Sequence, residues 1–162
     1  MESILPTDKS GEPSSFVSHL ECSAEGKIYE ADRLHGLSAA GKPMLVRYDL
    51  PAIKASVTTK DIAKRPANLW RYRELLPVRM TENIISLGET VTPLISVLSP
   101  DGSEILVKDE GRLPTGSFKA RGLCIAVSKA KELGVKVMAM PTNGNAGAAL
   151  AAYCAAANIK AD

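Results

Sequence analysis

The sequence predicts an α/β fold in which helices cover a parallel sheet, and three consecutive segments near the C-terminus carry this prediction. Apolar side chains recur at helical spacing from Leu123 to Leu133, and Gly134 is typical of a helix stop. Residues 135–140 are largely apolar, as in a short buried strand, and residues 146–157 are a second candidate helix. Alternation of strands and helices favours right-handed crossovers, and therefore parallel strands.

The chain begins with a polar segment. Residues 1–15 are rich in Ser, Pro and acidic side chains and lack the apolar stretch of a secretory signal, so we predict a disordered tail. Residues 16–50 have the outline of a two-knuckle zinc ribbon, with glycine-ended turns at residues 22–26 and 37–41. Because a structural zinc site needs four ligands and only Cys22 is a cysteine at a knuckle position, we predict a degenerate ribbon with no metal. The other knuckle positions hold Glu25, Leu37 and Ala40.

The α/β pattern occupies residues 51–162. Residues 51–77 are charged and compatible with helix at first. They end in an apolar cluster around Trp70, which we interpret as a segment that packs against the core. Residues 94–98 and 105–108 are predicted strands, since the segment between them contains the turn-forming residues Pro, Asp and Gly. The sequence stops where a further strand is expected, so we expect the fold to be incomplete at its C-terminus and the chain to be part of a longer protein.

Composition narrows the class of partner. The net charge of +2 is spread along the chain, and no basic run is interleaved with aromatic residues, so neither nucleic acid nor a membrane surface is indicated. No apolar stretch approaches the roughly 20 residues needed to cross a bilayer. The 3 cysteines are widely spaced, which favours reduced thiols. We predict a soluble, cytoplasmic protein with a small-molecule partner.

The first loop of chemical interest spans residues 110–117. We predict that Thr115 or Ser117 caps the following helix, which places Lys119 in the first turn. An ammonium there faces the positive end of the helix dipole, at a cost of up to about 1 kcal/mol. A lysine that must be neutral to attack an aldehyde suits this position. The alternative is an exposed lysine beside Arg121 whose stem merely packs.

The second loop, residues 141–145, offers hydroxyl and amide side chains together with the backbone amides of a helix N-terminus. Such an arrangement can hold a carboxylate or a phosphate. The alternative is that Thr142, Asn143 or Asn145 is simply the helix cap. Both loops follow strands, and ligands of α/β sheets bind at the carboxyl ends of strands, so we expect the two loops to be neighbours.

Together these motifs resemble the fold-type II pyridoxal-phosphate enzymes, the tryptophan synthase β-like family. The segment Thr-Gly-Ser-Phe-Lys-Ala-Arg-Gly at residues 115–122 resembles the Schiff-base lysine motif of threonine synthases and threonine dehydratases. Further segments are similar to the threonine synthase branch in particular: residues 69–77, 86–94, 107–111 and 144–153. The resemblance extends from residue 16 to the end. It implies that residues 51–162 are the first part of a catalytic α/β region with a parallel sheet.

The resemblance implies specific roles. Lys119 would hold pyridoxal 5′-phosphate and move protons on the substrate carbons, and Asn145 would hydrogen-bond the 3′-oxygen of the cofactor. The implied reaction converts O-phosphohomoserine and water to threonine and phosphate. No metal is expected, because the ribbon has too few ligands, and a homo-oligomer stays open. Substrate binding is implied for Ser117, Thr142, Asn143 and Gly144.

Some positions depart from the family pattern, namely Val91, Leu113 and Ala146, where relatives often have Gly, Asn and Thr. These changes concern substrate contacts and leave the cofactor lysine in place. The glycine-rich loop for the cofactor phosphate lies beyond the sequence, so the fragment is expected to be inactive by itself. Two alternatives stay open: a lyase similar to threonine or serine dehydratases, and a non-catalytic fragment of such an enzyme.

Overall fold

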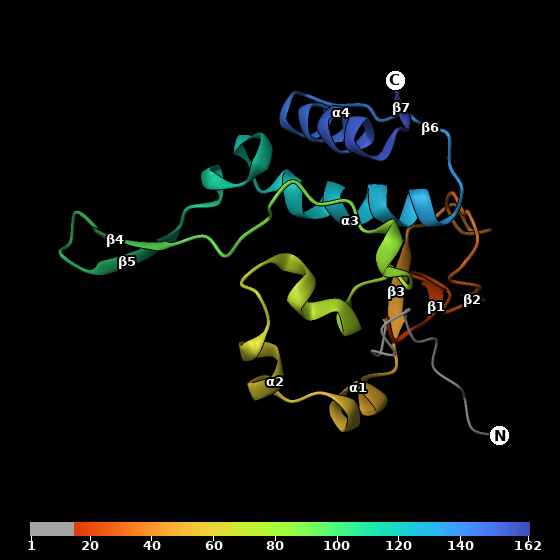
Figure 1. The fold of residues 1–162 in the computed structure, drawn as a ribbon, viewed down its shortest axis with the longest axis horizontal. Coiled ribbons are helices and arrows are strands. Elements are labelled where there is room, and N and C mark those ends of the chain that lie inside the picture. Colours follow the sequence, from red (N-terminus) through yellow and green to blue (C-terminus); the bar gives the residue numbers. More distant parts are fainter. Residues whose placement is uncertain (1–14) are drawn as a thin grey trace.

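The computed structural model describes residues 15–162 (Figure 1). The predicted tail at residues 1–15 lies outside this range except for Ser15, which is buried. The strands are β1 Val17–Cys22, β2 Ile28–Tyr29, β3 Met44–Tyr48, β4 Leu94–Leu98, β5 Glu104–Lys108, β6 Val137–Met138 and β7 Lys160–Ala161. The α-helices are α1 Leu50–Ser56, α2 Thr59–Lys64, α3 Lys119–Glu132 and α4 Asn145–Ala157. Short 3₁₀ helices lie at Leu69–Leu75, Thr81–Asn83, Glu110–Arg112 and Pro114–Gly116.

Helices α3 and α4 pack side by side and form the centre of the core (Figure 1). Each buries one stripe of side chains at helical spacing. In α3 the buried stripe includes Val127 but lies to one side of the apolar pattern read from the sequence, because Leu123 and Leu133 are only partly buried. Gly134 follows α3 with a φ of 75°, a left-handed conformation that ends the helix at little cost to glycine. The buried residues of the two helices are Ala120, Cys124, Val127, Ser128, Ala130, Ala149, Leu150, Tyr153 and Cys154.

The combination of helices and strands is that of the predicted α/β class. Parallel pairing among the described residues covers β6 and β7, where Val137 faces Lys160 and Met138 faces Ala161. Strand β5 precedes α3 and was expected in the same parallel sheet, but it pairs antiparallel with β4. The tight turn between β4 and β5 explains this difference, because it lets consecutive strands satisfy each other's backbone groups. A wide parallel sheet is therefore not confirmed.

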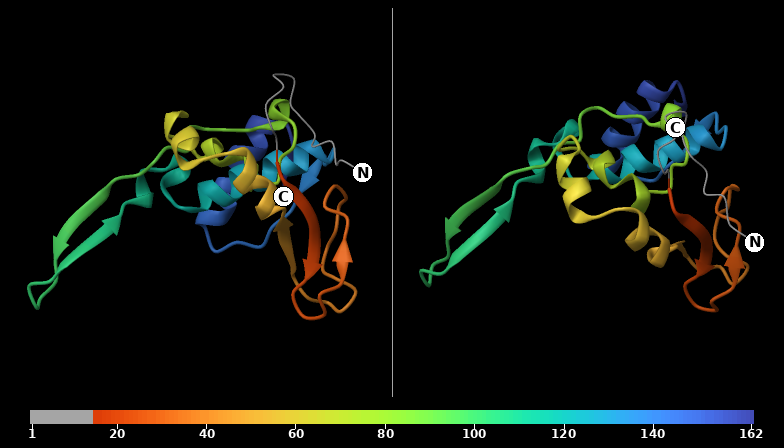
Figure 2. Two further views of the ribbon diagram at one scale, coloured as in Figure 1. Left: turned by 90° about the horizontal axis from the view of Figure 1, so that it is seen from below. Right: turned by 60° about the horizontal axis from the view of Figure 1, so that its bottom comes forward.

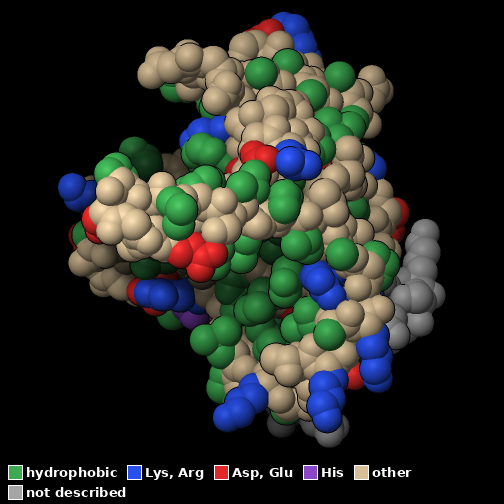
Figure 3. All heavy atoms as spheres, turned by 90° about the vertical axis from the view of Figure 1, so that its left-hand side faces the viewer, with side chains coloured by type: hydrophobic (Ala, Val, Ile, Leu, Met, Phe, Trp, Pro, Cys, Tyr) green, Lys and Arg blue, Asp and Glu red, His purple; other side chains and the backbone are tan. Residues whose placement is uncertain are grey.

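The β4–β5 hairpin projects away from the helices in all ribbon views (Figures 1 and 2). The predicted strands and turn are confirmed, with Asp101 accepting a hydrogen bond from the backbone amide of Ser103. Every residue of both strands is exposed, so neither face of the hairpin is covered. Figure 3 views the molecule from this side and shows hydrophobic side chains gathered on its surface. The exposed apolar side chains are Leu94, Ile95, Val97, Leu98, Ile105, Leu106 and Val107.

The N-terminal sheet has the strand order β2-β1-β3 and is antiparallel. Both predicted glycine-ended turns are present, with Gly26 and Gly41 each at a φ of 67°. The second turn presents Ser38 to the first, and the thiol of Cys22 donates a hydrogen bond to its hydroxyl over 3.2 Å. Leu37, the expected knuckle position, is exposed instead. Within residues 15–162 no group of three or more His, Cys, Asp or Glu side chains could hold a metal ion.

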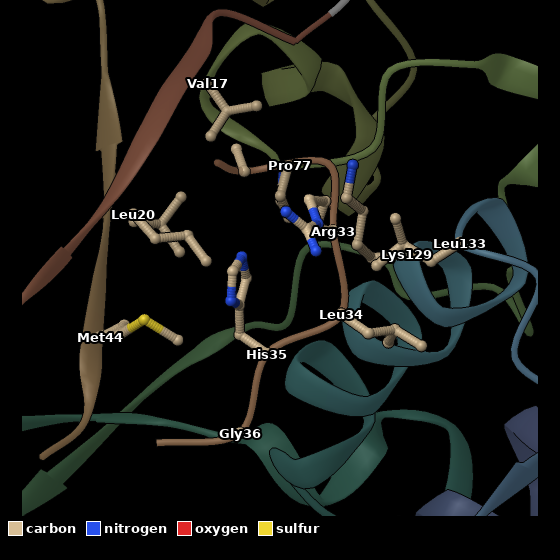
Figure 4. A pocket seen from close by; sticks show the side chains of 12 residues that line it. Val17, Leu20, Arg33, Leu34, His35, Gly36, Met44, Pro77, Lys129 and Leu133 are labelled. Atoms are coloured by element: carbon tan, nitrogen blue, oxygen red, sulfur yellow. The ribbon is translucent and has the colours of Figure 1, made fainter. Parts of the chain in front are cut away.

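Ion pairs join this sheet region to α3. Asp32 accepts from Lys129 over 2.8 Å and from Arg79 over 2.9 Å. A cavity of about 330 Å³ lies between the sheet and the C-terminal end of α3, where Leu20 and Met44 face Lys129 (Figure 4). No helix in the described part of the chain is both long and apolar enough to cross a membrane.

Candidate functional site

Lys119 is the first residue of α3, in the first turn where the sequence places it. Its side chain is half-buried, and its ammonium nitrogen lies 4.5 Å from the ring centroid of Phe118. Lys119 also lines a cavity of about 360 Å³ together with the second loop. The structure thus brings the predicted lysine and the predicted turn together. The other lining residues are Pro141, Thr142, Asn143, Gly144, Asn145 and Ala146.

The loop before α3 is strained. Thr115 has a φ of 66°, and a left-handed conformation costs a non-glycine residue about 1–3 kcal/mol. The prediction that Thr115 or Ser117 caps α3 is wrong, since Phe118 occupies the cap position and no side chain bonds the helix start. The left-handed turn at Thr115 and the extended backbone at Ser117 point both hydroxyls elsewhere.

Both hydroxyls in this loop are buried without a hydrogen-bond partner in the described structure. These are the Oγ1 atom of Thr115 and the Oγ atom of Ser117, and Ser117 is only 6% exposed. A buried polar atom left unpaired costs about 1–3 kcal/mol, so such atoms are uncommon unless another group completes them. Ser117 does not line the cavity at Lys119 but lies two residues before it in the chain. The loop therefore has unused hydrogen-bonding capacity next to the lysine.

In the loop before α4, a side chain of the loop accepts hydrogen bonds from the backbone amides around it. The Oγ1 atom of Thr142 accepts hydrogen bonds from the backbone amides of Gly144 over 3.0 Å and Gly147 over 2.8 Å. Gly144 occupies the cap position of α4, so none of the three candidate cap residues stands there. Thr142, two residues earlier, nevertheless does the work of a cap, because its hydroxyl accepts from the Gly147 amide in the first turn. The side chains of Asn143 and Asn145 are exposed and have no hydrogen-bond partner among residues 15–162. They remain available to a ligand in the cavity.

A model of the family described as pyridoxal-phosphate dependent enzyme matches residues 85–162, which include both loops. Residues 85–162 are thus similar to that family.

Three similar proteins from different organisms are each named threonine synthase. The threonine synthase of Methanocaldococcus jannaschii is 39% identical over 143 residues, which cover 86% of this chain and 35% of that protein. The threonine synthase of Methanosarcina acetivorans is 36% identical over 146 residues, covering 87% and 35%. That of Halalkalibacterium halodurans is 46% identical over 95 residues, covering 57% and 27%. The resemblance to threonine synthases is confirmed, and the chain spans 35% of the length of the first two relatives.

The residues present fit the cofactor of the pyridoxal-phosphate family. The cofactor is an aldehyde that binds a lysine amine, and Lys119 supplies an amine on the wall of a cavity of about 360 Å³. The side-chain amide of Asn145 lines the same cavity, and the unpaired hydroxyl of Ser117 lies two residues before Lys119 in the chain. The cavity thus offers an amine and side-chain amides, which suit a polar aromatic aldehyde.

Two carboxylates, the buried Glu89 and the partly buried Glu110, contact the two helices of the site, and the sequence pattern predicts a role for neither. Glu89 is fully buried, and its carboxylate accepts from the Ser86 hydroxyl over 2.6 Å, from the Leu87 amide over 2.9 Å and from the Tyr153 hydroxyl. Burial by itself raises the pKa of Glu89, but the hydrogen bonds from Ser86 and Tyr153 outweigh it and hold the pKa below its usual value. Because Tyr153 belongs to α4, this hydrogen bond holds α4 against the segment that contains Glu89.

Glu110 is the second carboxylate, at the start of the first loop. Arg121 donates to it twice, from Nε over 2.7 Å and from Nη2 over 2.9 Å, and the Thr92 hydroxyl donates over 2.5 Å. The Arg121 guanidinium holds the pKa of Glu110 at about 2, against the opposing effect of burial. Opposite charges on either side of the Thr-Gly-Ser segment were the signal in the sequence that could have revealed this pair.

Proposed function

We propose that this protein is a threonine synthase, which converts O-phosphohomoserine and water to threonine and phosphate. The observation that carries the proposal is the position of Lys119, which begins α3 on the wall of the cavity formed with residues 141–146. The name carried by the relatives, which are 36–46% identical, supports the choice of this reaction within the family.

We assign two residues to the cofactor. Lys119 binds pyridoxal phosphate through its side-chain nitrogen and afterwards moves a proton at the substrate carbons. Asn145 donates a hydrogen bond to the 3′-oxygen of the cofactor from a side chain that has no other partner in the described structure. When bound, the cofactor supplies an electron sink for carbanions, while the protein supplies position and electrostatics.

The substrate carboxylate is assigned to the turn at residues 142–144. The start of α4 presents backbone amides and the positive end of a helix dipole, an arrangement that favours anions. Asn143 adds an exposed amide, while Thr142 contributes by holding the turn in shape through its cap. Gly144 has a φ of 135°, which few other residues adopt, so its place in the turn depends on glycine. Ser117 is assigned to the substrate through its unpaired hydroxyl.

The fold of the whole protein is also proposed to be that of fold-type II enzymes, with a larger parallel sheet. The parallel pair β6–β7 supports this, as does the β4–β5 hairpin, whose uncovered apolar faces are typical of strands inside a larger sheet. A cytoplasmic location is supported by 3 buried cysteines that form no disulfide with one another: Cys22, Cys124 and Cys154.

The test is to incubate the full-length protein with O-phosphohomoserine and measure released phosphate and threonine. Lys119→Ala is expected to abolish both products and the absorbance of lysine-bound pyridoxal phosphate, because no other amine lines the cavity in the described structure. Lys136→Ala, an exposed lysine beyond the far end of α3, is the matched control and is expected to keep both. Absence of phosphate release from the unaltered protein contradicts the proposal. A keto acid made from threonine or serine instead identifies a dehydratase-like lyase.

A further inference from the structure

The residue Arg121 lies two positions after Lys119 in α3. Side chains two positions apart on a helix do not share a face, so Arg121 does not point where Lys119 points. Its guanidinium reaches the first loop instead, where it makes two hydrogen bonds to Glu110 and a third to the carbonyl of Thr90 over 3.1 Å. Arg121 therefore joins the first turn of α3 to the beginning of the loop that leads into it.

The partner Glu110 is itself fixed in place. The Thr92 hydroxyl donates to its carboxylate, and the ammonium of Lys108 lies 3.6 Å away while donating to the Thr92 hydroxyl over 2.8 Å. The side chains of Glu110 and Arg121 are only 21% and 26% exposed. A bidentate pair shielded from water to this degree is stronger and more directional than a surface ion pair. The base of the β4–β5 hairpin and the start of α3 are thus held together.

Between the two ends of this connection lies the strained part of the loop. Thr115 is held at a φ of 66°, and two buried hydroxyls lack partners, so the free loop gains by relaxing. A strained segment persists only when its surroundings hold it. The Glu110–Arg121 pair closes residues 110–121 into a ring around this turn, and it is the one bidentate ion pair in the described structure that spans the loop.

We propose that the Glu110–Arg121 ion pair is a clamp that holds the strained turn at Thr115 and so positions Lys119 for the cofactor. Arg121 and Glu110 are positioning residues, since both act through the lysine. This inference rests on the proposed function of Lys119. The further claim is that the position of Lys119 at the cavity depends on two charged side chains that contact neither the cofactor nor the substrate.

The test uses the full-length protein with Glu110→Gln, which keeps the shape of the side chain and removes its charge. The rate at which lysine-bound pyridoxal phosphate forms and kcat are both expected to fall about 10- to 100-fold, the scale of a misplacement of about 1 Å. KM for O-phosphohomoserine is expected to rise by no more than about 10-fold, since the second loop is untouched and Ser117 is the one assigned substrate contact in the released segment. Arg121→Lys keeps the positive charge but loses the bidentate hydrogen bonds of the guanidinium. It is expected to lower the rate of cofactor attachment and kcat less than Glu110→Gln does.

Arg112→Ala is the matched control. Arg112 lies in the same loop and pairs with Asp109 over 2.7 Å, but its side chain is 65% exposed and the pair does not span the turn. This variant is expected to behave like the unaltered protein. If Glu110→Gln does not fold, Arg121→Lys carries the test.

A second arm separates a clamp from a general stabilising pair. Thr115→Gly relieves the strained φ, so in that background Glu110→Gln is expected to lose less than half as much, on a logarithmic scale, as in the unaltered protein. Equal losses in both backgrounds, or a normal rate of cofactor attachment in both Glu110→Gln and Arg121→Lys, overturn the clamp. Absence of Lys119-dependent attachment in the unaltered protein overturns the proposed function itself, which is a different outcome.

Discussion

The two loops that meet at Lys119 differ in how they satisfy their own backbone and side chains. The first loop holds Thr115 in a left-handed conformation and buries two hydroxyls without partners. The second loop uses Thr142 to cap α4 and places its unusual backbone angle at Gly144. The first loop is therefore conformationally strained, whereas the backbone of the second loop is relaxed and its threonine is hydrogen-bonded. The contrast is what the proposed site requires, since the first loop keeps unpaired hydroxyls beside Lys119 while Thr142 of the second loop serves the start of α4.

The largest effect on stability is expected from crowding the second loop. A Cβ added at Gly147 meets Cγ2 of Thr142 at 2.5 Å, so Gly147→Ala is expected to lower the free energy of unfolding by about 1–3 kcal/mol. Urea denaturation measures this. Thr142→Ser removes the colliding methyl group, and the double variant is expected to recover part of the loss. Gly122→Ala in α3 is the control, because its Cβ meets nothing within 4 Å. Equal effects at Gly122 and Gly147 contradict the tight packing.

Loss of the cap in the second loop is expected to be the next largest effect. Thr142→Ala leaves the amides of Gly144 and Gly147 without their acceptor and is expected to cost about 1 kcal/mol of unfolding free energy. Thr142→Ser keeps the hydroxyl and is expected to cost less. An unchanged unfolding midpoint in Thr142→Ala means that water replaces the cap and that the second loop is not self-sufficient.

Relief of strain in the first loop is expected to act in the opposite direction. Thr115→Gly removes a strain of about 1–3 kcal/mol and adds a backbone entropy cost of about 0.5–1 kcal/mol. The net expectation is a gain of about 1 kcal/mol in unfolding free energy, with slower product formation. Thr115→Ala keeps the strained angle and removes the hydroxyl, so it separates the two contributions. A loss of stability in Thr115→Gly argues that the turn is not strained.

The smallest effect on stability is expected at Ser117. Its hydroxyl has no partner in the described structure, so Ser117→Ala is expected to change the unfolding free energy by no more than about 0.5 kcal/mol. KM for O-phosphohomoserine is expected to rise about 2- to 10-fold, the size of one hydrogen bond. Calorimetry and steady-state kinetics on the same sample measure both. Unchanged kinetics removes Ser117 from the site.

Local patterns predicted most of the elements. Helical spacing with Gly134 gave α3, and the turn residues around Asp101 gave the β4–β5 hairpin, because both depend on neighbours in the chain. The pairing of the strands could not be predicted in this way. The composition of β5 fits a parallel or an antiparallel strand equally well, and long-range packing determines which pairing forms. The cap at Ser117 or Thr115 failed because the left-handed angle at Thr115 is not visible in residue types.

The site was predicted in a similar way. Lys119 and the turn at residues 142–144 line one cavity, as expected from loops that follow strands at one sheet edge. The premise of a shared parallel sheet is not confirmed, however, since β5 pairs antiparallel with β4. The supporting contacts could not be foreseen, since Glu89 and Tyr153 lie 64 residues apart and meet only through folding. Ser38 likewise faces Cys22 across 16 residues, and the spacing of the turns alone had suggested Leu37.

The β4–β5 hairpin also bears on how this protein is handled and made. Its strands are apolar on both faces and have unpaired outer edges, and such edges are templates for pairing between separate chains. Residues 15–162 expressed by themselves are therefore expected to aggregate at high concentration. A charged residue at Val97, on an exposed apolar strand, is the simplest change for keeping this part of the protein in solution.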